Sequence, residues 1–140
     1  MLRLLNTFHT WVYRTTRGRL GRRLLWVPCL LLITTGRKTG KRRETALVYA
    51  EDGDRYVVVP SNAGADRAPG WLHNLRSKPD VEVYVGRRHV TALARVVGRD
   101  EPDFARLWKL VNENNGGRYD NYQSKTKRQI PVVVLDSTAG

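Results

Sequence analysis

A short basic segment with two glycines carries the residue types needed to hold a phosphate group. It spans residues 34–43 and reads Thr-Thr-Gly-Arg-Lys-Thr-Gly-Lys-Arg-Arg. Glycine lets the backbone turn and approach a ligand closely, while backbone N–H groups, threonine hydroxyls and basic side chains donate to phosphate oxygens. The segment therefore predicts a phosphate site. Spacing alone leaves two alternatives open, a solvated basic turn and a contact to a nucleic-acid backbone.

The same segment differs from the P-loop that binds ATP. Three residues, and not four, separate Gly36 from Gly40, and Arg42 stands where a P-loop has Ser or Thr after its lysine. No helix is predicted directly after the segment. These differences disfavour ATP as the ligand.

Small polar residues gather in a second segment, Ser61–Leu75, between an apolar strand and a short helix. This arrangement places backbone amides and the Ser61 hydroxyl at a strand end, where flat ligands often dock. Periodicity alone favours a core position for Trp71. The segment thus predicts a surface for a planar ligand.

A third segment, Tyr119–Pro131, begins with two tyrosines three residues apart, Tyr119 and Tyr122. Such a pair can line one wall of a pocket. Two surface tyrosines with an apolar body and a polar tip are the alternative.

Other catalytic patterns are missing from the sequence. The three histidines are scattered without metal-ligand spacing, so no metal site is predicted. There is no Gly-x-Ser-x-Gly motif, and no pair of carboxylates stands out for acid–base chemistry. A phosphate loop without such side chains points to a cofactor that itself carries the reactive group.

Charge is concentrated at the start of the chain. The 140 residues carry a net charge of +12, and residues 1–43 hold 11 of the 25 basic residues and no acidic one. The remaining residues carry 14 basic and 13 acidic side chains, a net charge of +1. This asymmetry predicts an anionic partner: a phosphorylated ligand, a membrane surface or nucleic acid.

The N-terminal residues 1–23 have the pattern of a basic amphipathic helix, with apolar and aromatic residues on one face of residues 1–17. Packing on the rest of the domain and attachment to an anionic membrane surface are both open. No apolar run is long enough for a membrane span. One cysteine, Cys29, excludes an internal disulfide and is interpreted as a small core residue. A cytoplasmic protein is expected, with peripheral attachment to the inner face of the membrane as the further possibility.

The elements expected to position these segments make up a single domain over residues 1–140. Strands alternate with hairpin signals at residues 51–54 and 86–88. Short hairpins imply antiparallel pairing, and this order is typical of a barrel or a strongly curled sheet. The predicted strands span residues 26–35, 44–50, 55–60, 81–85, 89–97 and 130–135. The predicted helices span residues 1–17, 69–76 and 100–115.

Taken together, the three segments resemble the deazaflavin-dependent nitroreductase family, whose hydride donor is coenzyme F420. The matching stretches are Ile33–Arg43, Ser61–Val85 and Tyr122–Leu135, in this order. The resemblance implies a mainly β fold with flanking helices (α+β), a split β-barrel of about six antiparallel strands. It also implies a reductase that transfers a hydride from reduced F420 to a quinone or a nitroaromatic.

The resemblance also implies roles for individual residues. Those implied to hold the cofactor's phosphate and acidic tail are Arg37, Lys38, Thr39 and Arg43. Those implied to line the deazaflavin ring are Thr45, Ala46, Leu47 and Val48, and Glu44 is a further residue implied to bind the cofactor. Those implied to cradle the ring and its ribityl chain are Val59, Pro60, Ser61, Asn62, Gly70, Trp71, Leu72, His73 and Asn74. Those implied to lie on the acceptor side are Tyr119 and Tyr122, and Tyr119 is implied to contact the cofactor as well. Either tyrosine hydroxyl is a hypothetical hydrogen-bond donor in catalysis.

Three other functions stay open. One is an FMN-binding oxidoreductase of the same barrel class. The basic residues Lys41, Arg42 and Arg43 favour coenzyme F420 over FMN, because FMN lacks the acidic tail of F420. Another is a nucleic-acid-binding module, which is disfavoured because the charge is confined to one third of the chain and no element for sequence recognition is evident. The last is a membrane-surface protein without activity.

Overall fold

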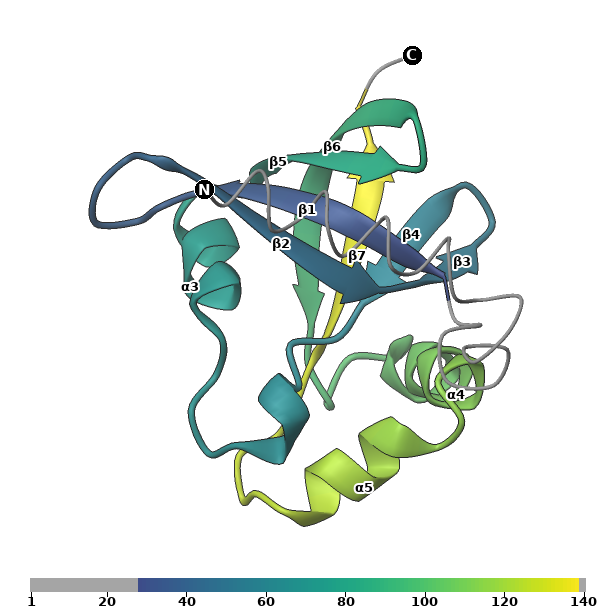
Figure 1. Cartoon of the computed structure of the whole chain (residues 1–140). Coiled ribbons are helices and arrows are strands. Elements are labelled where there is room, and N and C mark those ends of the chain that lie inside the picture. The colour runs from purple at the N-terminus through teal and green to yellow at the C-terminus, as the bar shows by residue number, and fades with distance from the viewer. Residues whose placement is uncertain (1–27, 139–140) are drawn as a thin grey trace, which may run out of the picture.

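Residues 28–138 are described by a computed structural model (Figure 1). The helix predicted over residues 1–23, with the face expected to meet a membrane, lies outside these residues. The first two residues of the strand predicted at 26–35 lie outside them as well.

One curled antiparallel sheet of seven strands forms the body of the protein, in the order β2-β1-β5-β6-β7-β4-β3. The mainly β fold with antiparallel hairpins is therefore confirmed, although about six strands were predicted. The strands are β1 (Cys29–Thr35), β2 (Arg42–Val48), β3 (Ala50–Asp52), β4 (Arg55–Val58), β5 (Asp80–Val85), β6 (Arg88–Val97) and β7 (Val132–Ser137).

The additional strand arises at Tyr49, which divides the strand predicted at 44–50. Val48 still pairs with β1, whereas Ala50 pairs with Val57 of β4. The N–H of Tyr49 donates to the carbonyl of Pro28 at 3.2 Å. Because β2 and β3 are the two outer strands of the sheet and a single residue separates them, the two edges meet at this point. The sheet is thereby curled into a half-barrel, and β1 and β2 run across β6 and β7 (Figure 1).

Helices flank the sheet at its two ends. They are the 3-10 turn η1 (Asn62–Gly64), α3 (Gly70–Ser77), α4 (Phe104–Asn114) and α5 (Arg118–Ser124). Figure 1 shows α3 near the loop between β1 and β2, while α4 and α5 lie near the other end of these strands. The predictions of α3 and α4 are confirmed, but α5 was missed. In the described part of the chain, no helix has both the length and the apolar character needed to cross a bilayer.

The core has two layers that share β4 and β7. Neighbouring residues on β7 alternate between them, since Val133 and Leu135 pack with α3 whereas Val132 and Val134 pack with α4 and α5. Val58 and Val57 of β4 divide in the same way. Both faces of these strands are therefore buried, which explains their continuous apolar runs.

The prediction for Cys29 was wrong, because its side chain is exposed. Cys29 is the first residue of β1, and the next residue, Leu30, faces the α3 layer of the core. Successive side chains on a strand point to opposite faces. Cys29 therefore lies on the face away from that layer, at an end of the strand where the covering is incomplete.

An ion-pair cluster joins α4 to the hairpin of β3 and β4. The two terminal nitrogens of Arg106 donate to the carboxylate oxygens of Asp52 at 2.8 and 3.2 Å, and Arg55 donates to the same carboxylate. These hydrogen bonds hold the pKa of Asp52 below its usual value, and the contribution from Arg106 is the largest. The charged form of Asp52 is thus stabilised by folding.

We expect Asp52→Asn to lower the midpoint of thermal unfolding at pH 7 but to have little effect in acid. A lowered pKa in the folded state adds stability above the unfolded pKa of about 3.9, and this stability is lost as the pH falls through the folded value. Thermal unfolding followed by circular dichroism at several pH values measures the difference. Asp54→Asn is the matched control, because Asp54 is an exposed acid of the same hairpin. An equal loss at every pH would contradict the role given to the charge.

Candidate functional site

The first two segments singled out from the sequence meet at one cavity. It has a volume of about 540 Å³ and lies between the loop that joins β1 to β2, the beginning of β2 and the beginning of α3. We call it the basic cavity. Its lining residues are Gly36, Arg37, Lys38, Thr39, Arg43, Glu44, Thr45, Gly70, Trp71 and Asn74.

Hydrogen bonds within the loop fix its shape. The N–H of Gly36 donates to the carbonyl of Lys41 at 2.7 Å, and the N–H of Gly40 donates to the carbonyl of Gly36 at 2.8 Å. The Thr39 hydroxyl accepts from the Lys41 N–H at 3.1 Å. A Cβ on Gly36 would lie 2.9 Å from that hydroxyl oxygen. A side chain at position 36 would displace this hydroxyl and press on the Lys41 carbonyl, 3.2 Å away, so glycine suits the point where the loop folds back on itself.

Asn74 of α3 holds the loop against the helix. Its side-chain oxygen accepts from the Arg37 N–H at 3.1 Å, and its side-chain nitrogen donates to the Thr34 hydroxyl at 3.2 Å. Thr34 is only 3% exposed. One amide side chain thus joins residues on both sides of Gly36 to a helix some forty positions later in the chain, and this contact unites the two predicted segments.

Positive charge without a carboxylate partner surrounds the basic cavity. Among the described residues, Arg37, Lys38 and Arg43 form no ion pair, whereas Arg42 pairs with Glu44 and Glu82, each at 3.4 Å. The cavity therefore offers three cations to a ligand. This donor set fits a phosphate group that carries a further anionic tail.

The remaining predicted cofactor residues do not line the basic cavity. Val59 and Leu72 are core residues, 5% and 2% exposed. His73 is half-buried on α3, and Pro60, Ser61 and Asn62 belong to a separate turn. The half-buried residues Ala46, Leu47 and Val48 continue along the edge strand β2 beyond the cavity.

The turn that contains Ser61 and Asn62 packs on α5. A Cβ on Gly64 would lie 2.8 Å from the carbonyl oxygen of Tyr122. Arg128, which the sequence analysis did not single out, donates to backbone carbonyls of this turn, and burial lowers its pKa. No spacing rule predicts such contacts, because an arginine bound to distant carbonyls has no sequence motif.

The two tyrosines of α5 have different surroundings. Their ring centroids are 6.2 Å apart. Tyr119 is 5% exposed, and burial raises its pKa to about 12. Tyr122 is half-buried, and the ammonium group of Lys125 lies 5.9 Å from its ring centre. Tyr119 is therefore part of the core, and Tyr122 lies closer to solvent.

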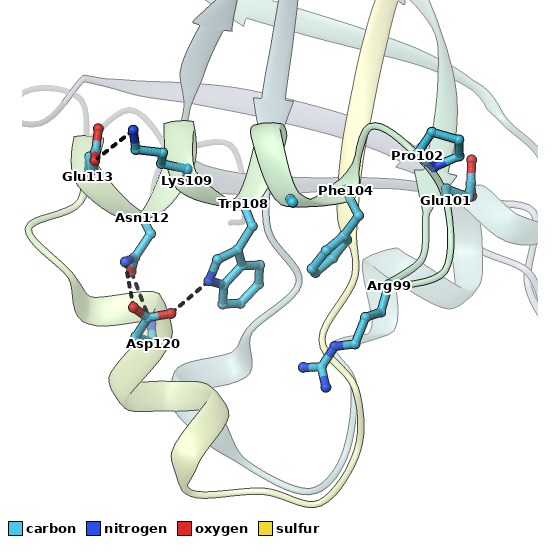
Figure 2. A pocket seen from close by; sticks show the side chains of 10 residues that line it. Arg99, Glu101, Pro102, Phe104, Trp108, Lys109, Asn112, Glu113 and Asp120 are labelled. Atoms are coloured by element: carbon cyan, nitrogen blue, oxygen red, sulfur yellow. Dashed lines mark hydrogen bonds and ion pairs between the residues drawn. The ribbon is translucent and has the colours of Figure 1, made fainter.

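A second cavity, of about 620 Å³, opens on the outer face of α4 (Figure 2). Its wall contains Phe104 and Trp108, whose stacked rings have centroids 5.5 Å apart. The indole N–H of Trp108 and the Asn112 side chain both donate to the carboxylate of Asp120, at 2.7 and 2.9 Å. These bonds join α4 to α5. None of the predicted cofactor or acceptor residues lines this cavity.

The fold of the curled sheet matches that of solved structures. A structure described as an F420-H2 dependent reductase (FDR-A) is 34% identical, with a TM-score of 0.69, over 78% of this chain and 94% of that one. Another, described as a domain-swapped dimer, is 31% identical, with a TM-score of 0.70, over 91% and 98% of the two chains. The protein is thus a split-barrel reductase by class.

The family model for F420H(2)-dependent quinone reductases matches residues 5–137, and the chain belongs to this family. An F420H(2)-dependent quinone reductase of Mycobacterium tuberculosis (strain H37Rv) is 54% identical over 128 residues, which are 91% of this chain and 86% of that protein. The predicted fold, the oxidoreductase class and reduced F420 as the cofactor are confirmed at the level of the family.

We expect Asn74→Ala to destabilise the protein by about 1–3 kcal/mol, because the buried Thr34 hydroxyl and the Arg37 N–H each lose a partner. Urea unfolding measures the loss, and faster hydrogen exchange of the Arg37 amide would locate it. Asn121→Ala is the control, since Asn121 is an exposed helical asparagine whose side chain has no hydrogen-bond partner among the described residues. Unchanged exchange at Arg37 in the Asn74 variant would contradict the role of this contact.

Proposed function

We propose that this protein reduces a quinone with a hydride from F420H2, and that the basic cavity holds the phosphate and acidic tail of the cofactor. The observation that carries the proposal is the set of three cations, Arg37, Lys38 and Arg43, that line a glycine-folded cavity without an ion pair among the described residues. An anionic ligand would replace the missing carboxylates.

The deazaflavin ring would then lie beyond the cavity, along β2. Thr45 lines the cavity, and the half-buried residues 46–48 continue from it toward Tyr49. The turn of residues 59–62 and the start of α3 would complete the cradle, with Leu72 and His73 contributing backbone groups. β2 suits this role because it is an edge strand, with one neighbour in the sheet.

When bound, reduced F420 supplies a hydride, and a quinone needs this hydride and one proton to become a hydroquinone. On this chain, Tyr122 is proposed to face the acceptor and to donate a hydrogen bond to its oxygen. Tyr119 packs behind it as the second wall residue. Tyr119 is only 5% exposed, so its role in this proposal is to hold the ring of Tyr122 in place.

We expect Lys38→Gln and Arg43→Gln each to weaken F420 binding about tenfold, because each removes a charge-assisted hydrogen bond. Fluorescence titration with F420 at increasing salt concentration measures the affinity, and the salt dependence should decrease in both variants. Arg95→Gln is the control, since Arg95 is an exposed arginine of β6 that pairs with Glu101, away from the basic cavity. FMN and duplex DNA are titrated in parallel. Tighter binding of either of these than of F420 would contradict the proposal.

We expect Tyr122→Phe to lower kcat with menadione roughly tenfold to a hundredfold, since a positioned proton donor contributes on this scale or above. Tyr119→Phe should have a smaller effect on kcat and a larger one on stability, because Tyr119 is a core residue. Tyr84→Phe, on β5, is the matched control. Steady-state oxidation of F420H2 measures all three variants. Unchanged turnover in the double variant of Tyr119 and Tyr122 would exclude the tyrosine hydroxyls as donors.

A further inference from the structure

Two consecutive residues of the turn before α3 adopt left-handed backbone angles although neither is glycine. They are Asn62, with φ 47°, and Ala63, with φ 55°. Side chains other than glycine disfavour this region, most clearly in alanine, which has no polar group to compensate. Such a conformation persists only where surrounding contacts hold it.

Besides the Asn62 side chain, which donates to the carbonyl of Arg67 at 2.9 Å, the side-chain hydrogen bonds that hold this turn come from Arg128. Its Nε donates to the carbonyl of Ala65 at 3.0 Å, and one terminal nitrogen donates to the carbonyls of Pro60 at 3.1 Å and Ser61 at 2.9 Å. These carbonyls precede and follow the left-handed pair. A single planar guanidinium therefore closes the turn from both sides.

A second group of hydrogen bonds fixes this arginine to α5. The Gln123 side chain donates to the Arg128 carbonyl at 2.7 Å and accepts from the Ile130 N–H at 2.9 Å. The Thr126 hydroxyl donates to the carboxylate of Asp66 at 2.7 Å. The turn, the end of α5 and the segment before β7 thus form one connected unit.

We propose that Arg128 is a positioning residue for the cofactor and acceptor site. It holds the turn of residues 60–65, in which Asn62 and Ala63 are left-handed, and fixes this turn to the helix that carries Tyr122. The ring-side turn and the acceptor-side tyrosine are then placed relative to one another by one side chain. This inference rests on the proposed function, because the turn is taken to contact the ring.

The chemistry of the guanidinium distinguishes this role from simple charge. Arg128 donates to carbonyls and forms no ion pair among the described residues, although the nearby carboxylate of Asp66 favours its charged form. A lysine keeps the charge but lacks the planar fork that reaches several acceptors in fixed directions. Arg128→Lys therefore separates the geometry of the contact from its charge.

The test compares Arg128→Lys with the double variant Arg128→Lys, Ala63→Gly. Glycine adopts positive φ without strain, so the second substitution should restore the turn if holding that shape is what Arg128 does. In the ligand-free protein, the amides of Gly64 and Ala65 donate to the carbonyls of Ser61 and Asn62. We expect their hydrogen exchange to become about tenfold faster in Arg128→Lys and to recover in the double variant.

Function is measured on the same proteins by titration with F420 and by steady-state kinetics with menadione. We expect Arg128→Lys to weaken F420 binding and to lower kcat/KM about tenfold, because misplaced reacting groups lose rate. The double variant should regain part of both. Arg95→Lys, an exposed arginine with an ion pair elsewhere, should match the unmodified protein.

The inference would be overturned if Arg128→Lys had the same amide hydrogen exchange and the same F420 affinity as the wild-type protein. It would also be overturned by a loss of thermal stability that leaves F420 affinity and kcat/KM per folded molecule unchanged, since this would show a purely structural role. If Arg128→Lys does not fold, Thr126→Val, which removes the link to Asp66, is measured in its place with the same expectations. A wild-type protein that binds no F420 would instead refute the proposed function, while the exchange data still decide whether Arg128 holds the turn.

Discussion

The single residue between β2 and β3 imposes the shape on which the other features depend. These strands are the two outer members of the sheet, and Tyr49 alone joins them. A flat sheet of this order would separate its outer strands by six inter-strand spacings, about 29 Å, which one residue cannot span. The sheet must therefore curl, and curling buries both faces of β4 and β7 between two core layers.

Two loops beside the curled sheet are held in place by side-chain hydrogen bonds. Asn74 holds the loop between β1 and β2 through the Thr34 hydroxyl and the Arg37 N–H, and Arg128 holds the turn after β4 through three carbonyls. In both places one polar side chain satisfies polar groups far away in the sequence. A loop held in this way keeps its shape before a ligand arrives, which reduces the entropy lost on binding.

The amino-acid sequence predicted the features that depend on residues close together in the chain, and the features that depend on distant residues were missed. Hairpins and the amphipathic helix α4 were predictable because turn residues and apolar spacing act over a few positions. The bend at Tyr49 was not, since it results from the pairing of Val48 with the earlier strand β1 and of Ala50 with the later strand β4. Helix α5 was missed because it is short and polar and is held by the contact of Asp120 with Trp108. Arg128 was missed because its acceptors lie more than sixty residues earlier.

Net charge predicted an anionic partner, but the local pairing of charges decides where that partner can bind. Arg42 is neutralised by Glu44 and Glu82, Arg106 by Asp52, and Arg128 binds carbonyls. At physiological ionic strength, exposed charges more than about 8 Å apart are largely screened from one another. The cations that act together on a ligand are therefore those that line one cavity, and the total of +12 matters less than the three cations around the basic cavity that have no ion pair in the described part of the chain.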